Sequence, residues 1–337
     1  MEHFQLKRAA DVKQALDMAT AQANAASQPG TPSIRFLAGG TTLLDLMKLD
    51  VECPAQVIDI HRLPLDKVET LDNGGVTIGA TVRNADLANH LLIKTRYPVL
   101  SQALLSGASA QLRNMATTGG NLLQRTRCVY FRDTNTPCNK REPGSGCSAI
   151  GGFNRNLAIL GTSEHCIATN PSDMNVAMTA LEASVHVESA QGKRSIGIDD
   201  FFLLPGTTPE RETSLNAGEL ITHVTLPAPM PGSHSVYLKL RDRASYEFAL
   251  ASAAVVLTVS SGRIDHVRIA MGGVGVKPWR SHEAEAALLG RSPDATAFRA
   301  AAEAALQTAR PQSQNGFKVE LAKRCIQHAL TLATRTA

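Results

Sequence analysis

The sequence predicts an α+β protein built from two or three globular units. Three observations predict this fold class: an apolar strand runs directly into a glycine turn near residue 39, a glycine-turn hairpin precedes a long helical stretch, and the last third places strands before Ala-rich helices. With 337 residues, 43% of them hydrophobic, the chain is long enough to bury more than one core.

The N-terminal elements follow in a clear order. An amphipathic helix is expected to begin near Asp11, and a Gln-Pro-Gly-Thr-Pro break at 28–32 ends that segment. An apolar strand at 34–38 then leads into Gly39, Gly40 and Thr41 without a spacer. A strand that leads through a glycine turn directly into a helix is typical of a ligand-binding turn.

The middle of the chain alternates hairpins and helices. Strands at 68–71 and 76–78 flank the Asp-Asn-Gly-Gly turn at 72–75, and residues 83–107 are mostly helical in pattern. A loop-rich stretch at 124–170 breaks the periodicity, and a loop of this length is typical of a functional segment. Helix returns at 174–183, followed by a hairpin at 185–198.

The C-terminal third is predicted to be a separate unit. The proline-rich segment 226–232 has the composition of a linker, so a domain boundary is expected there. Strands at 253–259 and 267–271 join around Ser261 and Gly262, and Ala-rich helices continue to the end. Strands first and helices last is the order of a small α+β unit.

Composition excludes several function classes. Only 19% of residues are charged, the net charge is +4, and Lys and Arg are scattered, which argues against a nucleic-acid surface. The first residues carry both charges and no apolar run typical of a signal peptide, and no later stretch reaches membrane-spanning length. The expectation is a chain made in the cytoplasm as a soluble protein.

Two glycine motifs are candidates for binding phosphate. The segments LAGGTTLLD at 37–45 and ATTGGNL at 116–122 each place two glycines beside hydroxyl residues at the start of a helix. Glycine lets backbone N–H groups approach an anion, and Thr or Asn side chains add hydrogen bonds. Together they predict a diphosphate-containing ligand, whereas either pair alone could simply form a turn. Neither motif is a GxGxxG fingerprint or a P-loop.

These two motifs, with TNPSDMN at 169–175, resemble the flavoprotein subunits of the xanthine dehydrogenase and carbon monoxide dehydrogenase family of molybdenum hydroxylases. The segment AMGGVGVKPWR at 270–280 resembles the C-terminal signature of that family. The resemblance implies a vanillyl-alcohol-oxidase-like (PCMH-type) FAD-binding domain in two subdomains over 1–228. It also implies an α+β domain over 233–337, similar to the carbon monoxide dehydrogenase flavoprotein C-terminal domain.

The resemblance also implies the residues that bind FAD. Residues 38–43 and 118–122 would wrap the pyrophosphate, Asp173 would hydrogen-bond in the ribose and adenine region, and Lys239 would stabilise negative charge at the flavin ring. As a lone lysine, Lys239 could instead be a solvated surface residue. The full expected set is Leu37, Ala38, Gly39, Gly40, Thr41, Thr42, Leu43, Thr117, Thr118, Gly119, Gly120, Asn121, Asp173 and Lys239.

Four of the six cysteines fall in the loop-rich stretch: Cys128, Cys138, Cys147 and Cys166. Thiolates select zinc or iron-sulfur clusters, and four of them satisfy either. No C-x2-C knuckle occurs, so spacing alone does not identify the metal, and free thiols or disulfides stay open. The isolated Cys53 and Cys325 are expected to be buried small side chains.

Here the resemblance is to a branch of the family, the periplasmic aldehyde oxidoreductases, whose insertion after the second glycine motif binds a 4Fe-4S cluster. The segment from about residue 124 to about residue 168 resembles that insertion. The resemblance implies that the cluster ligands are Cys128, Cys138, Cys147 and Cys166. The nearby Arg125, Arg127, Arg132, Lys140 and Arg141 either offset the charge of the cluster or form a solvated loop face.

The implied function is that of the FAD and 4Fe-4S electron-transfer subunit of a heterotrimeric aldehyde oxidoreductase. A large subunit would hold the molybdenum cofactor and oxidise the aldehyde, and a small subunit would carry 2Fe-2S clusters. Electrons would leave FAD for an external acceptor such as a ferredoxin or a quinone-linked carrier. The resemblance implies a periplasmic location, reached by co-export with a signal-bearing partner, with the cytoplasm as the alternative.

Three other functions remain open from the sequence. The chain could be a stand-alone FAD-dependent oxidase, a subunit of a related molybdenum hydroxylase with another substrate, or a zinc-stabilised nucleotide-binding module without redox activity. Substrate-driven reduction of flavin by this chain alone would identify the first. A colourless preparation that contains zinc and no iron would identify the last.

Overall fold

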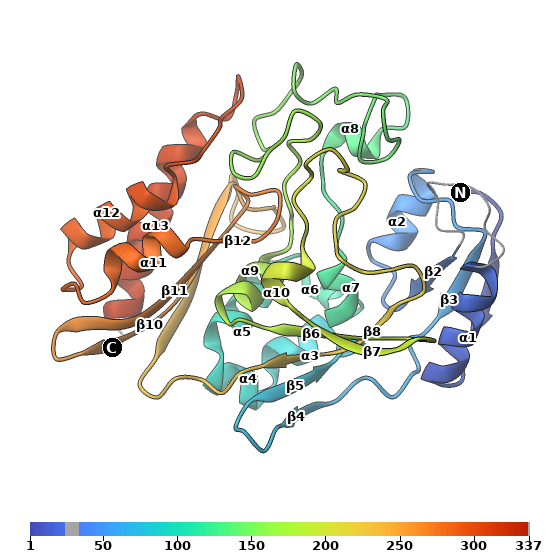
Figure 1. Cartoon of the computed structure of the whole chain (residues 1–337), viewed down its shortest axis with the longest axis horizontal. Helices are drawn as coiled ribbons and strands as arrows, with labels where there is room; N and C mark the ends of the chain where they lie inside the picture. The colour runs from blue at the N-terminus through green and yellow to red at the C-terminus, as the bar shows by residue number, and fades with distance from the viewer. Residues whose placement is uncertain (24–33, 336–337) are drawn as a thin grey trace.

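The computed structural model describes residues 1–23 and 34–335, and these form three sheets with helices packed on them (Figure 1). The α+β prediction is therefore confirmed. The break predicted at 28–32 lies outside the described residues.

The N-terminal part is a small parallel sheet. Its strands are β1 (Gln5–Arg8), β2 (Ile34–Leu37) and β3 (Gln56–Asp59), in the order β1-β3-β2, with α1 (Val12–Ala23) and α2 (Leu43–Lys48). Ile58 of the central strand packs against Ala15 and Leu16 of α1. The predicted helix and strand 34–38 are confirmed, whereas β1 and β3 were not predicted.

The middle part is an antiparallel sheet of five strands, in the order β4-β5-β8-β6-β7. Both predicted hairpins are confirmed, and the helical stretch 83–107 divides into three helices, the last of which starts at Pro98. The strands are β4 (Val68–Thr70), β5 (Val76–Gly79), β6 (Ser184–Ser189), β7 (Gly192–Gly197) and β8 (Leu220–Leu226). The helices are α3 (Asn84–Asn89), α4 (Leu91–Arg96), α5 (Pro98–Ser106), α6 (Ala110–Arg113), α7 (Thr118–Leu122), α8 (Val129–Arg132) and α10 (Ile198–Phe201).

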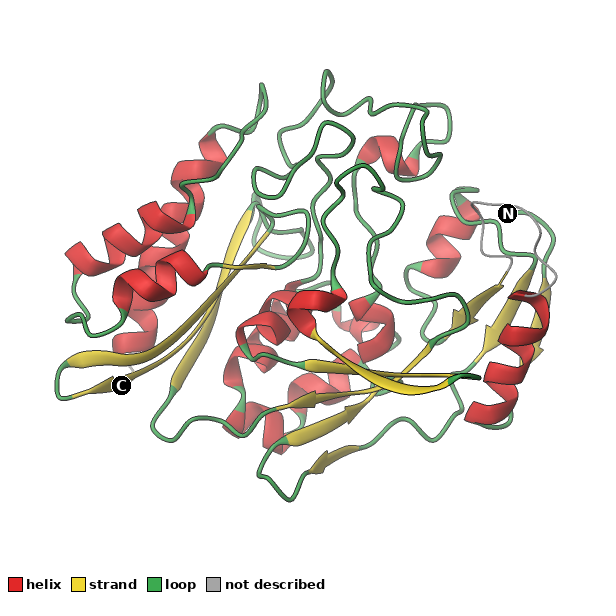
Figure 2. Cartoon of the chain, viewed as in Figure 1, coloured by secondary structure: helices red, strands yellow, loops and turns green. Residues whose placement is uncertain are grey.

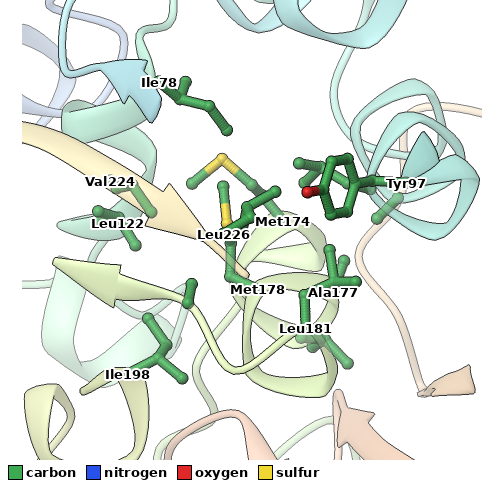
Figure 3. Packing of buried hydrophobic residues seen from close by; sticks show 14 of the residues in the cluster. Ile78, Tyr97, Leu122, Met174, Ala177, Met178, Leu181, Ile198, Val224 and Leu226 are labelled. Atoms are coloured by element: carbon green, nitrogen blue, oxygen red, sulfur yellow. The ribbon is translucent and has the colours of Figure 1, made fainter. Parts of the chain in front are cut away.

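Helix α9 (Asp173–Ala180) lies at the centre of the middle core. Every residue of this helix is buried, as expected for a helix that is surrounded on all sides. Figure 3 shows Met174 and Met178 among side chains from the sheet and from the helices. The Ser172 hydroxyl caps the helix by accepting from the Asn175 N–H at 3.2 Å. Packing and cap together fix the position of Asp173.

The C-terminal part is a sheet of four strands with helices on one face. Alternate residues of the central strand β10 enter different cores: Ala254 and Val256 join the middle core, whereas Val255 and Leu257 join the core under the C-terminal helices. Both faces are thus buried, which explains the nearly continuous apolar run. The elements are β9 (His234–Leu240), β10 (Ala251–Ser260), β11 (Arg263–Gly272), β12 (Trp279–Arg280), α11 (His282–Leu288), α12 (Ala295–Ala305) and α13 (Phe317–Arg335).

The segment between α7 and α9 is fully described and contains one short helix, α8. Figure 2 shows the rest of it as loops at one end of the molecule. The loop prediction for 124–170 is therefore confirmed. Residues 227–233 also lack regular structure, and they connect β8 to β9, neither of which was predicted.

Candidate functional site

The two glycine turns lie against each other. A Cβ atom added at Gly39 would come within 1.9 Å of the carbonyl oxygen of Met115 and 3.1 Å of the Cα of Ala116. Only glycine allows such an approach of two backbones. Gly40 adopts a φ of 71°, in the left-handed region that also favours glycine. The structure therefore brings segment 37–43 into contact with the start of the second motif.

The first turn offers a row of unused donors. Within the described chain, the backbone N–H groups of residues 38–43 have no hydrogen-bond acceptor. Carbonyl oxygens of the same turn accept from the first residues of α2: Gly40 from Leu44 and Thr42 from Leu46. Successive free N–H groups at such a turn form a concave site for an anion. Leu37, Thr41 and Leu43 are partly exposed, so a ligand can reach the turn.

The second turn is mostly satisfied inside the protein. The Thr118 and Gly119 N–H groups donate to the carbonyls of Val82 and Ala80, at 2.9 and 2.8 Å. The Thr117 hydroxyl caps α7 by accepting from the Gly120 N–H at 3.3 Å. The Asn121 Oδ1 accepts from the hydroxyl of Ser172, the residue before Asp173, at 2.7 Å. This turn therefore supports the first one and offers fewer donors of its own than the first.

Asp173 and Lys239, which the sequence analysis assigned to different parts of FAD, form one buried ion pair. The Lys239 ammonium donates to Asp173 Oδ2 at 2.8 Å, and the Tyr237 hydroxyl donates to Asp173 Oδ1 at 2.5 Å. Only 3% of the Lys239 side chain is exposed, so its interpretation as a solvated surface residue is wrong. The pKa of Tyr237 is raised well above its usual value, mainly because the hydroxyl is buried and secondly because the charge of Asp173 lies beside it.

Tyr237 was not predicted as a site residue. It precedes Lys239 by two positions on β9, and residues two apart on a strand share a face. That alternation was the signal in the sequence that could have identified it.

A cavity of about 190 Å³ opens beside Asp173. Its walls come from the start of α9, the β9–β10 loop, the end of β11 and the cysteine-bearing loop, and they include Val176, Phe248, Gly272 and Arg127. The cavity is smaller than the roughly 300–1,000 Å³ of typical ligand pockets, so it fits one end of a dinucleotide and not the whole molecule.

The four clustered cysteines all line a second cavity, together with Phe131 and Lys140. None of the four is in a disulfide, and three are buried while Cys147 is half-buried. Cys138 and Cys147 face each other across a short antiparallel bridge. Burial raises the pKa of Cys128 to about 11 and also raises that of Cys166, so a metal would have to displace their protons.

The basic residues of the loop are paired, and their interpretation as a solvated face is wrong. Arg141 donates to the carbonyls of Tyr130, Phe131 and Thr136. The other four bind carboxylates from other parts of the chain: Arg125 binds Glu52 and Glu212 at 2.5 Å each, Lys140 binds Glu212 at 3.1 Å, and Arg127 and Arg132 share Asp45 at 3.2 and 2.7 Å. These ion pairs hold the loop against the rest of the protein.

The Glu212 carboxylate is the centre of this arrangement. Burial alone would raise its pKa, but the charges of Arg125 and Lys140 outweigh burial and lower the pKa to about 2. Glu212 is therefore ionised at neutral pH, and its carboxylate stays bound to the loop.

The two isolated cysteines differ. Cys325 is buried as predicted, and burial raises the pKa of its thiol to about 12. Cys53 is exposed, so its predicted burial is wrong. The neighbouring Glu52 points inward to Arg35 and Arg125, which turns the Cys53 side chain outward.

Comparisons with known proteins cover nearly the whole chain. Residues 2–229 match the family model described as the FAD-binding domain in molybdopterin dehydrogenase, and residues 236–333 match the CO dehydrogenase flavoprotein C-terminal domain. The chain is 53% identical to the FAD-binding subunit PaoB of an aldehyde oxidoreductase from Escherichia coli K12, over 93% of this chain and 95% of the relative.

More distant relatives also match along most of the chain. The glyceraldehyde dehydrogenase medium chain of Sulfolobus acidocaldarius is 32% identical, over 78% of this chain and 75% of its own. A solved structure of the carbon monoxide dehydrogenase of Hydrogenophaga pseudoflava, which lacks the Mo-pyranopterin moiety, superposes with a TM-score of 0.77 at 27% identity, over 99% of this chain and 98% of its own.

Proposed function

Because the chain belongs to the family of FAD-binding domains of molybdopterin dehydrogenases, we propose that it is the FAD-binding, electron-transferring subunit of a molybdenum-dependent aldehyde oxidoreductase. The observation that carries the proposal is the turn at 38–43: its N–H groups have no acceptor in the described chain, and it packs against the start of the second glycine motif. This arrangement fits the pyrophosphate of FAD.

The residues of this chain would hold FAD at three places. The N–H groups of residues 38–43 would bind its pyrophosphate, Asn121 and Ser172 would line the approach, and the pair of Asp173 with Lys239 would meet one end of the cofactor at the cavity. Bound FAD supplies the chemistry of accepting two electrons and releasing them singly or together. The protein orients FAD, excludes water and supplies fixed charges.

The cysteine loop is proposed to bind a 4Fe-4S cluster through Cys128, Cys138, Cys147 and Cys166. All four line one cavity and none is in a disulfide. A four-iron cluster binds each thiolate to a different iron, so four cysteines around one cavity supply one ligand for each iron.

The proposed partners are a large subunit with the molybdenum cofactor, a small subunit with 2Fe-2S clusters, and an external acceptor such as a ferredoxin or a quinone-linked carrier. Relatives are named as medium chains, which supports a complex of subunits. The chain would deliver electrons and not oxidise the aldehyde itself. The proposed location is the periplasm, reached with a signal-bearing partner. No helix in the described part of the chain is long and apolar enough to cross a membrane.

Anaerobic mixing with an aromatic aldehyde tests this function. The isolated FAD-loaded chain should keep its flavin oxidised, and the same chain in complex with the molybdenum and 2Fe-2S subunits should be bleached. Bleaching of the isolated chain would support the stand-alone oxidase and overturn the proposal.

A further inference from the structure

Arg127 connects the cavity beside Asp173 to the cysteine loop. Its Nη1 donates to the Asp45 carboxylate at 3.2 Å, and its guanidinium carbon lies 5.1 Å from the centre of the Phe248 ring. The side chain lines the cavity, and the next residue in the chain is Cys128. Two neighbours thus fix the guanidinium at the cavity wall.

This guanidinium keeps an unused donor. Its Nε is buried and has no hydrogen-bond partner in the part of the chain that the structure describes. A buried donor without an acceptor is destabilising, and an acceptor on a bound ligand would remove that penalty.

The ion pairs around the cavity also leave the positive charge of Arg127 only partly neutralised. Its carboxylate, Asp45, is shared with Arg132 at 2.7 Å, so two cations face one anion. The carboxylates that line the cavity each have a cation of their own: Asp173 has Lys239, Asp242 has Arg155 and Glu247 has Arg243, at 2.8, 2.8 and 3.5 Å. The cavity wall therefore favours a ligand edge that accepts hydrogen bonds and takes up negative charge.

We propose that Arg127 is a further residue of the flavin site, with its Nε–H donating to the carbonyl edge of the flavin ring. This rests on the proposed function, because it assigns the cavity to the flavin end of FAD. The pyrimidine edge of flavin carries two carbonyl acceptors and gains negative charge on reduction, whereas the ring-nitrogen acceptors of adenine stay neutral. The free N–H groups of residues 38–43 already provide a site for the pyrophosphate. The positive charge of Arg127 makes the reduced flavin more favourable.

The test compares variants of the full chain. Arg127→Gln should weaken the binding of FAD about tenfold, the effect of losing one charge-assisted hydrogen bond, and should lower the midpoint potential of the bound flavin. Arg127→Lys keeps the charge and should retain most of the potential while losing affinity. Arg132→Gln is the matched control: it removes a second partner of Asp45, but Arg132 does not line the cavity, so the potential should stay unchanged.

FAD affinity is measured by titration of the flavin-free chain, and the potential by anaerobic spectroelectrochemistry. If Arg127→Gln leaves the flavin potential at the wild-type value, the inference is overturned, even if affinity falls. If that variant fails to fold, Arg127→Lys decides, because wild-type affinity in Arg127→Lys would also overturn the role of the Nε–H. Failure of the wild-type chain to bind FAD is a different result, and it would overturn the proposed function itself.

Discussion

The glycine turns and the cysteine loop are held in place by different forces. The turns are fixed by backbone contacts at close range, with Gly39 against Met115 and the N–H groups of the second turn bonded to the carbonyls of Ala80 and Val82. The loop is fixed by ion pairs that reach far along the sequence, since Arg125 binds carboxylates 73 and 87 residues away. The two regions should therefore respond to different substitutions, and FAD and the proposed cluster should be separable.

The largest effect is expected from Gly39→Ala. The new Cβ would meet the Met115 carbonyl at 1.9 Å, so one of the two turns must move. We expect a loss of about 3 kcal/mol or more in the free energy of unfolding and loss of FAD. Urea unfolding and flavin content measure this. Gly151→Ala in the cysteine loop is the control, because nothing lies within 4 Å of its added Cβ. Equal effects of the two changes would contradict the comparison.

The second test removes the cluster and keeps the flavin. Cys138→Ser should lower iron and acid-labile sulfide per chain, whereas FAD should remain because the glycine turns lie outside the loop. Iron, sulfide and flavin assays measure this. Cys53→Ser, a change at an exposed thiol, should alter none of the three. Unchanged iron in Cys138→Ser would refute the ligand assignment.

The third test uses pH to loosen the loop. The pKa of Glu212 is about 2 in the folded chain and about 4.5 when unperturbed, so its ion pairs stabilise the fold fully above pH 4.5 and lose that effect as the pH falls toward 2. Glu212→Gln should cost about 2 kcal/mol at pH 7 and should show a smaller loss between pH 4.5 and 2 than the wild type.

Urea unfolding at several pH values measures the effect of Glu212→Gln. Glu320→Gln is the control, because its pair with Arg324 is exposed on α13 and should contribute little. Parallel pH curves for the wild type and Glu212→Gln would show that Glu212 does not stabilise the fold in this way.

The smallest effect is expected from Asp45→Asn. Asp45 is partly exposed, so loss of its pairs with Arg127 and Arg132 should cost only about 0.5–1 kcal/mol. The change should still loosen the loop locally. Hydrogen exchange should become faster at 126–133 and stay unchanged at 116–122, because the second glycine turn is held by backbone bonds. Faster exchange in both segments would show that the regions are coupled.

Features encoded by local sequence could be predicted. The strand into Gly39 and the two hairpins are formed by residues close in sequence, so apolar periodicity and turn residues identified them. The clustered cysteines were visible directly in the sequence. Strand β1 was missed because its four residues are exposed, and it shows no apolar alternation. Strand β9 was missed because its residues are mostly half-buried.

Contacts between distant residues could not be predicted. Asp173 and Lys239 are 66 residues apart, and their pairing depends on how α9 packs on the sheet that contains β9. Likewise the partners of Arg125 and Lys140 lie on other elements, so charge alone left their role open. The outward Cys53 shows the same limit, because the inward turn of Glu52 depends on Arg125 far along the chain.

A single chain of this protein is proposed to hold both FAD and a four-iron cluster. The most direct measurement is the content of flavin, iron, acid-labile sulfide and zinc in the anaerobically purified full-length chain. We expect one FAD with about four iron and four sulfide per chain. A colourless chain with zinc, without iron and without flavin, would contradict it.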